Sequence, residues 1–178
     1  MRNAATSRVV AHAAVRSSPG GALRACAAAL LIALPAVAGA APGGTARPHE
    51  GRCDTVVNAL PSGTLEIELD CQFRHLGRTT GLLVQQVIPS GPPVGGVLPA
   101  TLLATVSYTA ANGDTLVGTF TGTAAIDLAT GAVRYSGVET LTGGTGRFAH
   151  ASGTSLLNGT ASTVSNAGFY VTSGTLDY

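Results

Sequence analysis

The sequence contains no lysine, and charged and aromatic residues are scarce, at 11% and 4% of its 178 residues. Proteins that bind nucleic acids present clustered lysine and arginine, and those that bind single strands add aromatic side chains on which bases stack. The chain has neither feature, so its composition argues against a nucleic-acid partner. It argues equally against attachment to an anionic membrane surface.

Several catalytic and metal-binding signatures are also missing. There is no Walker loop, which needs a lysine before a helix, and no G-x-S-x-G nucleophile motif. The cysteines lack C-x-x-C spacing, and the histidines are not spaced as zinc ligands. We therefore expect His49, His75 and His150 to lie at the surface, and we expect neither a metal nor a cofactor.

Small residues and threonine are abundant instead. The chain contains 24 glycines, and threonine recurs throughout. Threonine favours pleated strands and glycine weakens helices, so this mixture is typical of short strands and tight turns. The length supports one domain with a buried core. The composition predicts a single all-β domain.

The first forty residues have a different character. Four arginines precede an apolar run over residues 25–38, which leads into Ala38-Gly39-Ala40. These features are typical of a secretory signal peptide, and the run is too short and alanine-rich for a membrane-spanning helix. We predict a signal peptide over residues 1–40, cleavage near Ala40, and a bacterial protein that is secreted or periplasmic and not attached to the membrane. The remaining chain has six arginines against nine acidic residues, a net charge of −3.

Residues 41–51 are rich in proline and glycine, which indicates a flexible leader before a domain over residues 52–178. Within that domain, Cys53 and Cys71 flank a predicted hairpin. In an oxidising compartment this arrangement favours one disulfide over a reactive thiol pair or a metal site. Closing a loop of this length stabilises a fold by roughly 3 kcal/mol in the chain-entropy model.

Alternating residues mark the first strands. In TLEIELD, residues 64–70, aliphatic side chains alternate with three carboxylates, which predicts a strand with one buried and one wet face. We interpret the carboxylates as a solvated face, with a calcium site as the alternative. Residues 78–88 form a longer predicted strand. Residues 89–100 hold four prolines and predict the longest loop, either a binding rim or an exposed crossover.

The rest of the chain predicts a series of hairpins. The clearest turn is Asn112-Gly113-Asp114, because Asn-Gly readily adopts positive φ. In residues 116–126 one face carries glycine and hydrocarbon side chains, and the other carries mostly hydroxyls. Inward glycines relieve crowding in a strongly bent sheet. We predict an antiparallel β-barrel of about eight strands, because closure removes exposed edges.

A glycine-rich corner lies at residues 141–153, LTGGTGRFAHASG. Gly143, Gly144 and Gly146 allow backbone angles closed to other residues, so the strand can reverse direction. We expect Phe148 to plug the end of the core and Arg147 to hydrogen-bond to nearby carbonyls.

This corner resembles the GG[TS]G-x-F corner of the allene oxide cyclase barrel and of the related plant dirigent proteins. Residues 112–174 also resemble small secreted bacterial proteins of that superfamily. The resemblance covers roughly the C-terminal half and implies an eight-stranded barrel with a central cavity, assembled as a trimer. It further implies ring closure of an unstable epoxide or the positioning of phenoxy radicals. The first half contains no match to either family's catalytic positions.

Candidate site residues lie on the predicted strand over residues 132–142, where Glu139 shares an otherwise apolar face with Tyr135. A carboxylate there is either a barrel-mouth residue in water or a lumen group that could act as acid or base. If the other face is inward, Arg134 takes its place. The candidates for ligand contact are Tyr108, Phe120, Tyr135 and Glu139, and those for catalysis are Glu139, Tyr135 and Arg147.

Two classes of function stay open. We favour a non-catalytic barrel that binds a small apolar or phenolic ligand or serves as a structural module. The alternative is a cofactor-free cyclase or isomerase, or a dirigent-like guide of radical coupling, acting in the lumen. An enzyme needs a roomy lumen with buried ionisable groups, whereas a structural barrel is filled by its own side chains.

Overall fold

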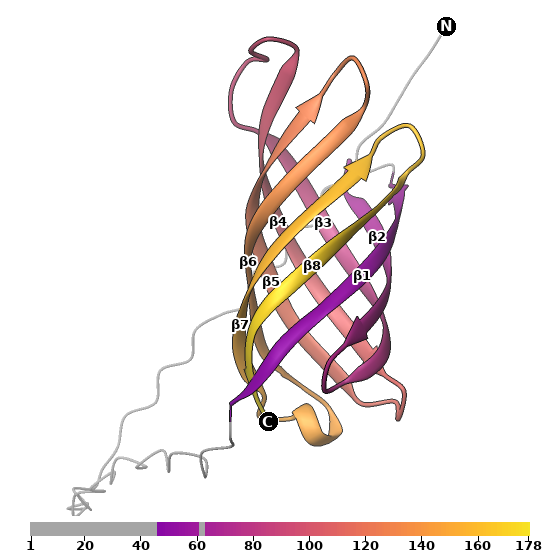
Figure 1. Cartoon of the computed structure of the whole chain (residues 1–178), viewed down its shortest axis with the longest axis vertical. Coiled ribbons are helices and arrows are strands. Elements are labelled where there is room, and N and C mark those ends of the chain that lie inside the picture. The colour runs from indigo at the N-terminus through magenta and orange to yellow at the C-terminus, as the bar shows by residue number, and fades with distance from the viewer. Residues whose placement is uncertain (1–45, 61–62) are drawn as a thin grey trace, which may run out of the picture. The chain divides into compact units, whose positions relative to one another are not determined.

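Eight β-strands follow one another along the chain, each antiparallel to its neighbours, and β8 pairs back with β1 (Figure 1). The computed structural model describes residues 46–60 and 63–178. The elements are β1 (Arg47–Ala59), β2 (Leu65–Phe73), β3 (Gly77–Pro89), β4 (Val97–Ala110), β5 (Thr115–Asp127), β6 (Ala132–Gly144), the short 3₁₀ helix η1 (Gly146–Phe148), β7 (Ser152–Ser162) and β8 (Ala167–Asp177). The predicted all-β, eight-stranded antiparallel barrel is confirmed. The predicted signal peptide lies outside the described residues.

Side-chain alternation decides which residues face the interior. On β5, Leu116 and Phe120 are buried, whereas Val117 and Thr119 are exposed. The face of glycine and hydrocarbon therefore points inward, and the hydroxyl face points outward. The same alternation on β6 turns Glu139 inward.

Inward glycines make room for the aromatic side chains. The Phe120 ring covers Gly137 on β6, where an added Cβ would lie 2.6 Å from the ring carbon Cε2. The Tyr135 ring covers Gly159, its partner on β7, in the same way. A methyl group at either position would displace a ring, so these glycines determine how far the aromatic side chains reach across the lumen.

The glycine-rich corner closes one end of the barrel, which we call the closed end. Gly146 has a φ of +54°, and a Cβ there would overlap the carboxylate of Asp114. The helix η1 then places Phe148, which is fully buried, against the Tyr178 ring, with ring centroids 5.0 Å apart. The corner thus reverses the chain and puts an aromatic ring beneath the core.

Two boundaries differ from the prediction. β1 begins at Arg47, so residues 47–51 belong to the barrel and not to a leader, because they pair with the last strand, His49 opposite Gly174. Residues 41–45 lie outside the described part of the chain. β4 begins at Val97, so the loop predicted over residues 89–100 spans only residues 90–96.

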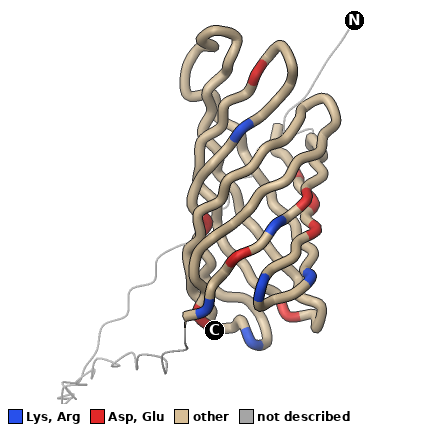
Figure 2. Tube along the Cα trace, viewed as in Figure 1, with Lys and Arg blue, Asp and Glu red and all other residues tan. Residues whose placement is uncertain are grey.

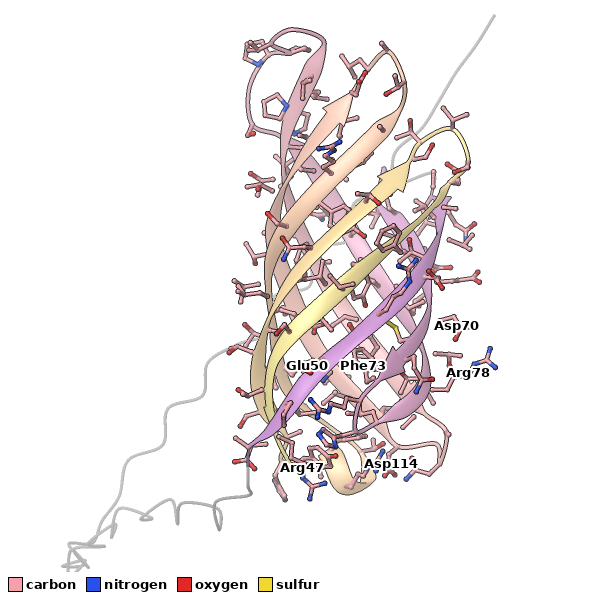
Figure 3. All side chains as sticks on the ribbon, in the orientation of Figure 1. Arg47, Glu50, Asp70, Phe73, Arg78 and Asp114 are labelled. Carbon is pink, nitrogen blue, oxygen red and sulfur yellow. A yellow bond between two sulfur atoms is a disulfide. The ribbon has the colours of Figure 1, made fainter. Side chains whose placement is uncertain are left out.

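Charged residues gather along β1 to β3 and at the closed end, and much of the rest of the described chain carries none (Figure 2). The Arg78 guanidinium lies 2.8 Å from a carboxylate oxygen of Asp70, and both side chains project from the barrel (Figure 3). Hydrogen bonding to Arg78 lowers the pKa of Asp70. The carboxylates of the alternating strand thus face solvent. Within residues 46–60 and 63–178, no group of three or more His, Cys, Asp or Glu side chains could hold a metal ion.

Cys53 and Cys71 lie directly opposite each other on β1 and β2, both buried, and form a disulfide. The predicted bridge is confirmed, and it is compatible with an extracellular location. In the described part of the chain, no helix has the length and hydrophobicity needed to cross a bilayer.

Candidate ligand-binding cavity

The half of the barrel away from the closed end holds a cavity of about 360 Å³, a size within the range of small-molecule sites. Toward the closed end its wall is buried, as at Leu102 on β4 and Leu157 on β7. Toward the other end, inward side chains such as Ile126 on β5 and Val133 on β6 are only partly buried. The cavity therefore opens at the opposite end, which we call the mouth. The strands β1, β3, β5 and β7 end at this end of the barrel, and β2, β4, β6 and β8 begin there (Figure 1).

The cavity wall is predominantly aliphatic. Within the described residues that line it, none carries a formal charge at neutral pH. Its non-aromatic polar members are Thr55 and Gln85 on the strands, and Ser162, Thr163 and Asn166 at the β7–β8 hairpin. Such a wall suits an apolar molecule.

Three buried side chains form a hydrogen-bonded chain that leads away from the cavity. Tyr170 on β8 belongs to the cavity wall, and its hydroxyl lies 2.8 Å from that of Tyr108 on β4. The Tyr108 hydroxyl donates to Oε1 of Glu139 on β6 across 2.6 Å. All three residues are at most 2% exposed. We call Tyr170, Tyr108 and Glu139 the relay.

His49 lies beside the far end of the relay. Its Nε2 is 3.7 Å from Oε2 of Glu139, and its ring stacks on Phe73 with centroids 4.6 Å apart. Neither ring nitrogen of His49 nor Oε2 of Glu139 has a hydrogen-bond partner within the described protein. Buried polar groups are usually hydrogen-bonded, so this is a poorly satisfied part of the interior.

Burial holds the tyrosines in their neutral form. Desolvation, followed by the Tyr170 and Glu139 charges, raises the pKa of Tyr108 well above its ordinary value. Desolvation and the charge of Glu139 do the same to the pKa of Tyr170, and desolvation alone raises the pKa of Tyr135 to about 12. At neutral pH these phenols are hydrogen-bond donors and acceptors, and not bases.

The predicted site residues lie in three places: the cavity wall, the relay, and, for Arg147, the outside of the closed end. Phe120 and Tyr135 line the cavity, and the Tyr135 hydroxyl donates to the Phe169 carbonyl across 3.4 Å. Tyr108 and Glu139 lie behind Tyr170, on the side of the closed end.

The assignment of Arg147 to the lumen is wrong. Its guanidinium lies over the outer side of the Phe148 and Tyr178 rings, 4.6 and 5.7 Å from their centroids, and is 3.9 Å from the Asp114 carboxylate. The η1 turn directs Phe148 inward, so the residue before it points to solvent. The inward alternative Arg134 is also exposed.

Sequence reasoning missed two members of this region. His49 was expected at the surface and is 1% exposed, because pairing with β8 extends the barrel to residues outside the predicted domain. Tyr170 could have been found from the sequence, because it shares one face of its strand with Gly168, Thr172 and Gly174, and small residues of this kind mark an inward face. His75 and His150 are exposed.

Chemically, this arrangement can enclose an apolar molecule against a wall in which Tyr170 is the one relay residue. Glu139 does not line the cavity, and the two tyrosines of the relay connect it to the wall. Comparisons with protein-family models, with curated proteins and with solved structures find no match to this chain. The resemblance to the allene oxide cyclase and dirigent barrels therefore stays a prediction.

Proposed function

We propose that the protein is an exported β-barrel that binds a small, largely apolar molecule in its cavity and catalyses no reaction. The cavity of about 360 Å³ with its aliphatic wall is the observation that carries this proposal. A purely structural barrel would be filled by its own side chains. Here the half near the closed end is filled, whereas small residues such as Ala124 and Ala161 line the other half.

Export rests on the basic and apolar segments of residues 1–40 and on the A-x-A site. The buried disulfide supports an oxidising compartment. N-terminal sequencing of the protein recovered from the medium or the periplasm tests cleavage near Ala40. The trimer implied by the family resemblance stays a prediction, which light scattering on the same material tests.

A pair of adjacent alanines on β5 tests the cavity. Ala124 points inward and lines it, and its neighbour Ala125 points outward. We expect a neutral apolar dye, N-phenylnaphthylamine, to bind saturably with increased fluorescence. Ala124→Phe should weaken binding by about 1.5 kcal/mol, or about tenfold, because the new ring occupies surface that the dye would bury. Ala125→Phe is the matched control and should leave affinity within about twofold.

Two results would contradict this proposal. The first is no saturable binding by the folded wild-type protein. The second is an Ala124→Phe variant that is folded and binds the dye as the wild type does, because the dye would then bind outside the cavity.

The relay favours a second candidate, a cyclase or isomerase or a dirigent-like guide of radical coupling, with Tyr135 in the cavity wall and Glu139 acting on the cavity through the relay. The supporting observation is the Glu139 carboxylate, which connects to the cavity wall through two phenol hydroxyls. Chiral analysis of products from an unstable allylic epoxide, or from phenoxy radicals, tests it. An enantiomeric excess that disappears in Glu139→Gln supports catalysis, and racemic products with the wild-type protein exclude it for those substrates.

A further inference from the structure

The number of protons in the relay determines what Tyr170 can offer to a ligand. A phenol hydroxyl carries one proton and can also accept. The Tyr108 proton is donated to Oε1 of Glu139 across 2.6 Å. The 2.8 Å contact between Tyr108 and Tyr170 must therefore use the proton of Tyr170. With that proton directed away from the cavity, the Tyr170 oxygen has only lone pairs left.

Tyr170 is also where the relay meets the cavity. Of the three relay residues, it alone belongs to the described wall of the cavity. Its hydroxyl is fixed by Tyr108, which is itself fixed by the buried carboxylate. Rotating the Tyr170 proton toward a ligand would break the contact with Tyr108 inside a buried site. An unmade buried hydrogen bond is costly, so the relay keeps Tyr170 as an acceptor.

The cavity should also bind anionic ligands poorly, because no positively charged side chain lies in its described wall. None of the described residues in the cavity wall is an arginine, and the six arginines of the barrel all belong to exposed positions. A carboxylate in this cavity would lose its hydration without gaining a cation, and it would approach the buried Glu139.

The other polar groups of the wall do not reverse this preference. Thr55 and Gln85 can each donate and accept. Ser162, Thr163 and Asn166 lie at the mouth, where solvent competes.

We propose that the cavity selects neutral, largely apolar molecules that carry a hydroxyl group, and that this hydroxyl donates its proton to the Tyr170 oxygen. This inference deepens the proposed ligand-binding function and rests on it. It distinguishes alcohols and phenols from the corresponding ethers and carboxylates, which an apolar cavity alone would not do.

Three naphthyl compounds test the proposal: naphthylethanol, its methyl ether and naphthylacetate. They share one fluorescent ring, and the protein contains no tryptophan, so ligand fluorescence is free of interference from that residue. The protein is expressed from the full-length gene and recovered after export. We expect the alcohol to bind about tenfold more tightly than the ether, because one good hydrogen bond contributes about that much to the affinity. We expect naphthylacetate to bind at least about a hundredfold more weakly than the alcohol.

Two variants test the direction of the proton. In Tyr170→Phe the acceptor is gone, so alcohol and ether should bind within about twofold of each other, and ether affinity should match that of the wild type. In Tyr108→Phe the Tyr170 proton is released and can be donated to an ether oxygen, so ether affinity should rise by about fivefold over the wild type. Tyr178→Phe removes a phenol hydroxyl outside the cavity and is the matched control, with the wild-type preference retained.

Each outcome decides between the inference and the function on which it rests. Equal binding of alcohol and ether by the wild-type protein overturns the inference and leaves ligand binding standing. A preference for the alcohol that persists in Tyr170→Phe overturns it as well. If Tyr108→Phe does not fold, Tyr170→Phe carries the test alone. If none of the three compounds binds the folded wild-type protein although N-phenylnaphthylamine does, the inference fails alone. If the dye does not bind either, the proposed function fails, and the inference fails with it.

Discussion

The strongest prediction about stability concerns the Tyr108 hydroxyl at the centre of the relay. Tyr108→Phe removes one bond of 2.6 Å to a carboxylate and one of 2.8 Å to a phenol. A buried bond to a charged group contributes about 2 kcal/mol and one between neutral groups about 1 kcal/mol, so the free energy of unfolding should fall by about 3 kcal/mol. For a domain of this size the melting temperature should fall by about 10 °C.

Urea unfolding followed by circular dichroism measures this change at neutral pH. Tyr178→Phe is the control, because its hydroxyl only accepts a long contact of 3.5 Å from exposed Arg47, and it should cost less than about 0.5 kcal/mol. The double variant Tyr108→Phe, Glu139→Leu removes both partners at once. It should be more stable than the two single changes predict together, by about 2 kcal/mol, because the buried Glu139 carboxylate is then removed together with its donor and is not left unpaired.

Two results would refute this reasoning. A loss below about 1 kcal/mol in Tyr108→Phe would mean that water replaces the missing hydroxyl, so that the relay is not dry. Strictly additive effects in the double variant would mean that Tyr108 and Glu139 are not energetically coupled, whatever their distance.

Three further predictions use other parts of the barrel. Replacing Cys53 and Cys71 by alanine should lower the free energy of unfolding by roughly 3 kcal/mol in urea titrations, and a loss below about 1 kcal/mol would contradict the chain-entropy argument. Burial raises the pKa of Tyr135 to about 12, above the value near 10 of tyrosine in an unfolded chain. Below pH 10 the neutral Tyr135 side chain therefore makes its full contribution to the free energy of unfolding. That contribution, about 2–3 kcal/mol, should be lost as the pH rises from about 10 to about 12, and tyrosinate absorbance that appears before unfolding in a Tyr178→Phe background would disprove the burial. Gly146→Ala, which meets both a positive φ and an occupied space, should lower the melting temperature more than Gly95→Ala, which meets only a positive φ of +59°. Equal effects would show that the corner tolerates a side chain.

The sequence was sufficient to predict most of the fold, because the barrel is built from local patterns. Alternation on β5 and β6 predicted the strands, and glycine on the hydrocarbon face of β5 indicated which side turns inward. The turn Asn112-Gly113-Asp114 was placed correctly because positive φ at Gly113 is a local requirement. In each of these cases the physical cause lies within a few residues of its effect.

The candidate site depends on distances that no local pattern contains. Tyr108, Glu139 and Tyr170 come from three strands, and their hydroxyl and carboxyl groups meet only because of the stagger between strands around the closed barrel. His49 was missed for the same reason, since β8 extends the sheet into a segment whose proline and glycine suggested a leader. Arg147 was misplaced because it belongs to the short η1 turn, which directs the next side chain, Phe148, into the core and the Arg147 side chain toward solvent.

The seam between β1 and β8 has a consequence for how the protein folds. It joins residues more than a hundred positions apart, such as Cys53 and Tyr170, and contacts of such long range are slow to form. The relay and His49 come from both sides of this seam, so the deep end of the cavity is complete only when the last strand has docked. If the chain is exported N-terminus first, as proposed above, it cannot assemble this region until the β8 segment is free. Ligand affinity would therefore report on closure of the barrel, and a bound molecule would protect the seam against opening.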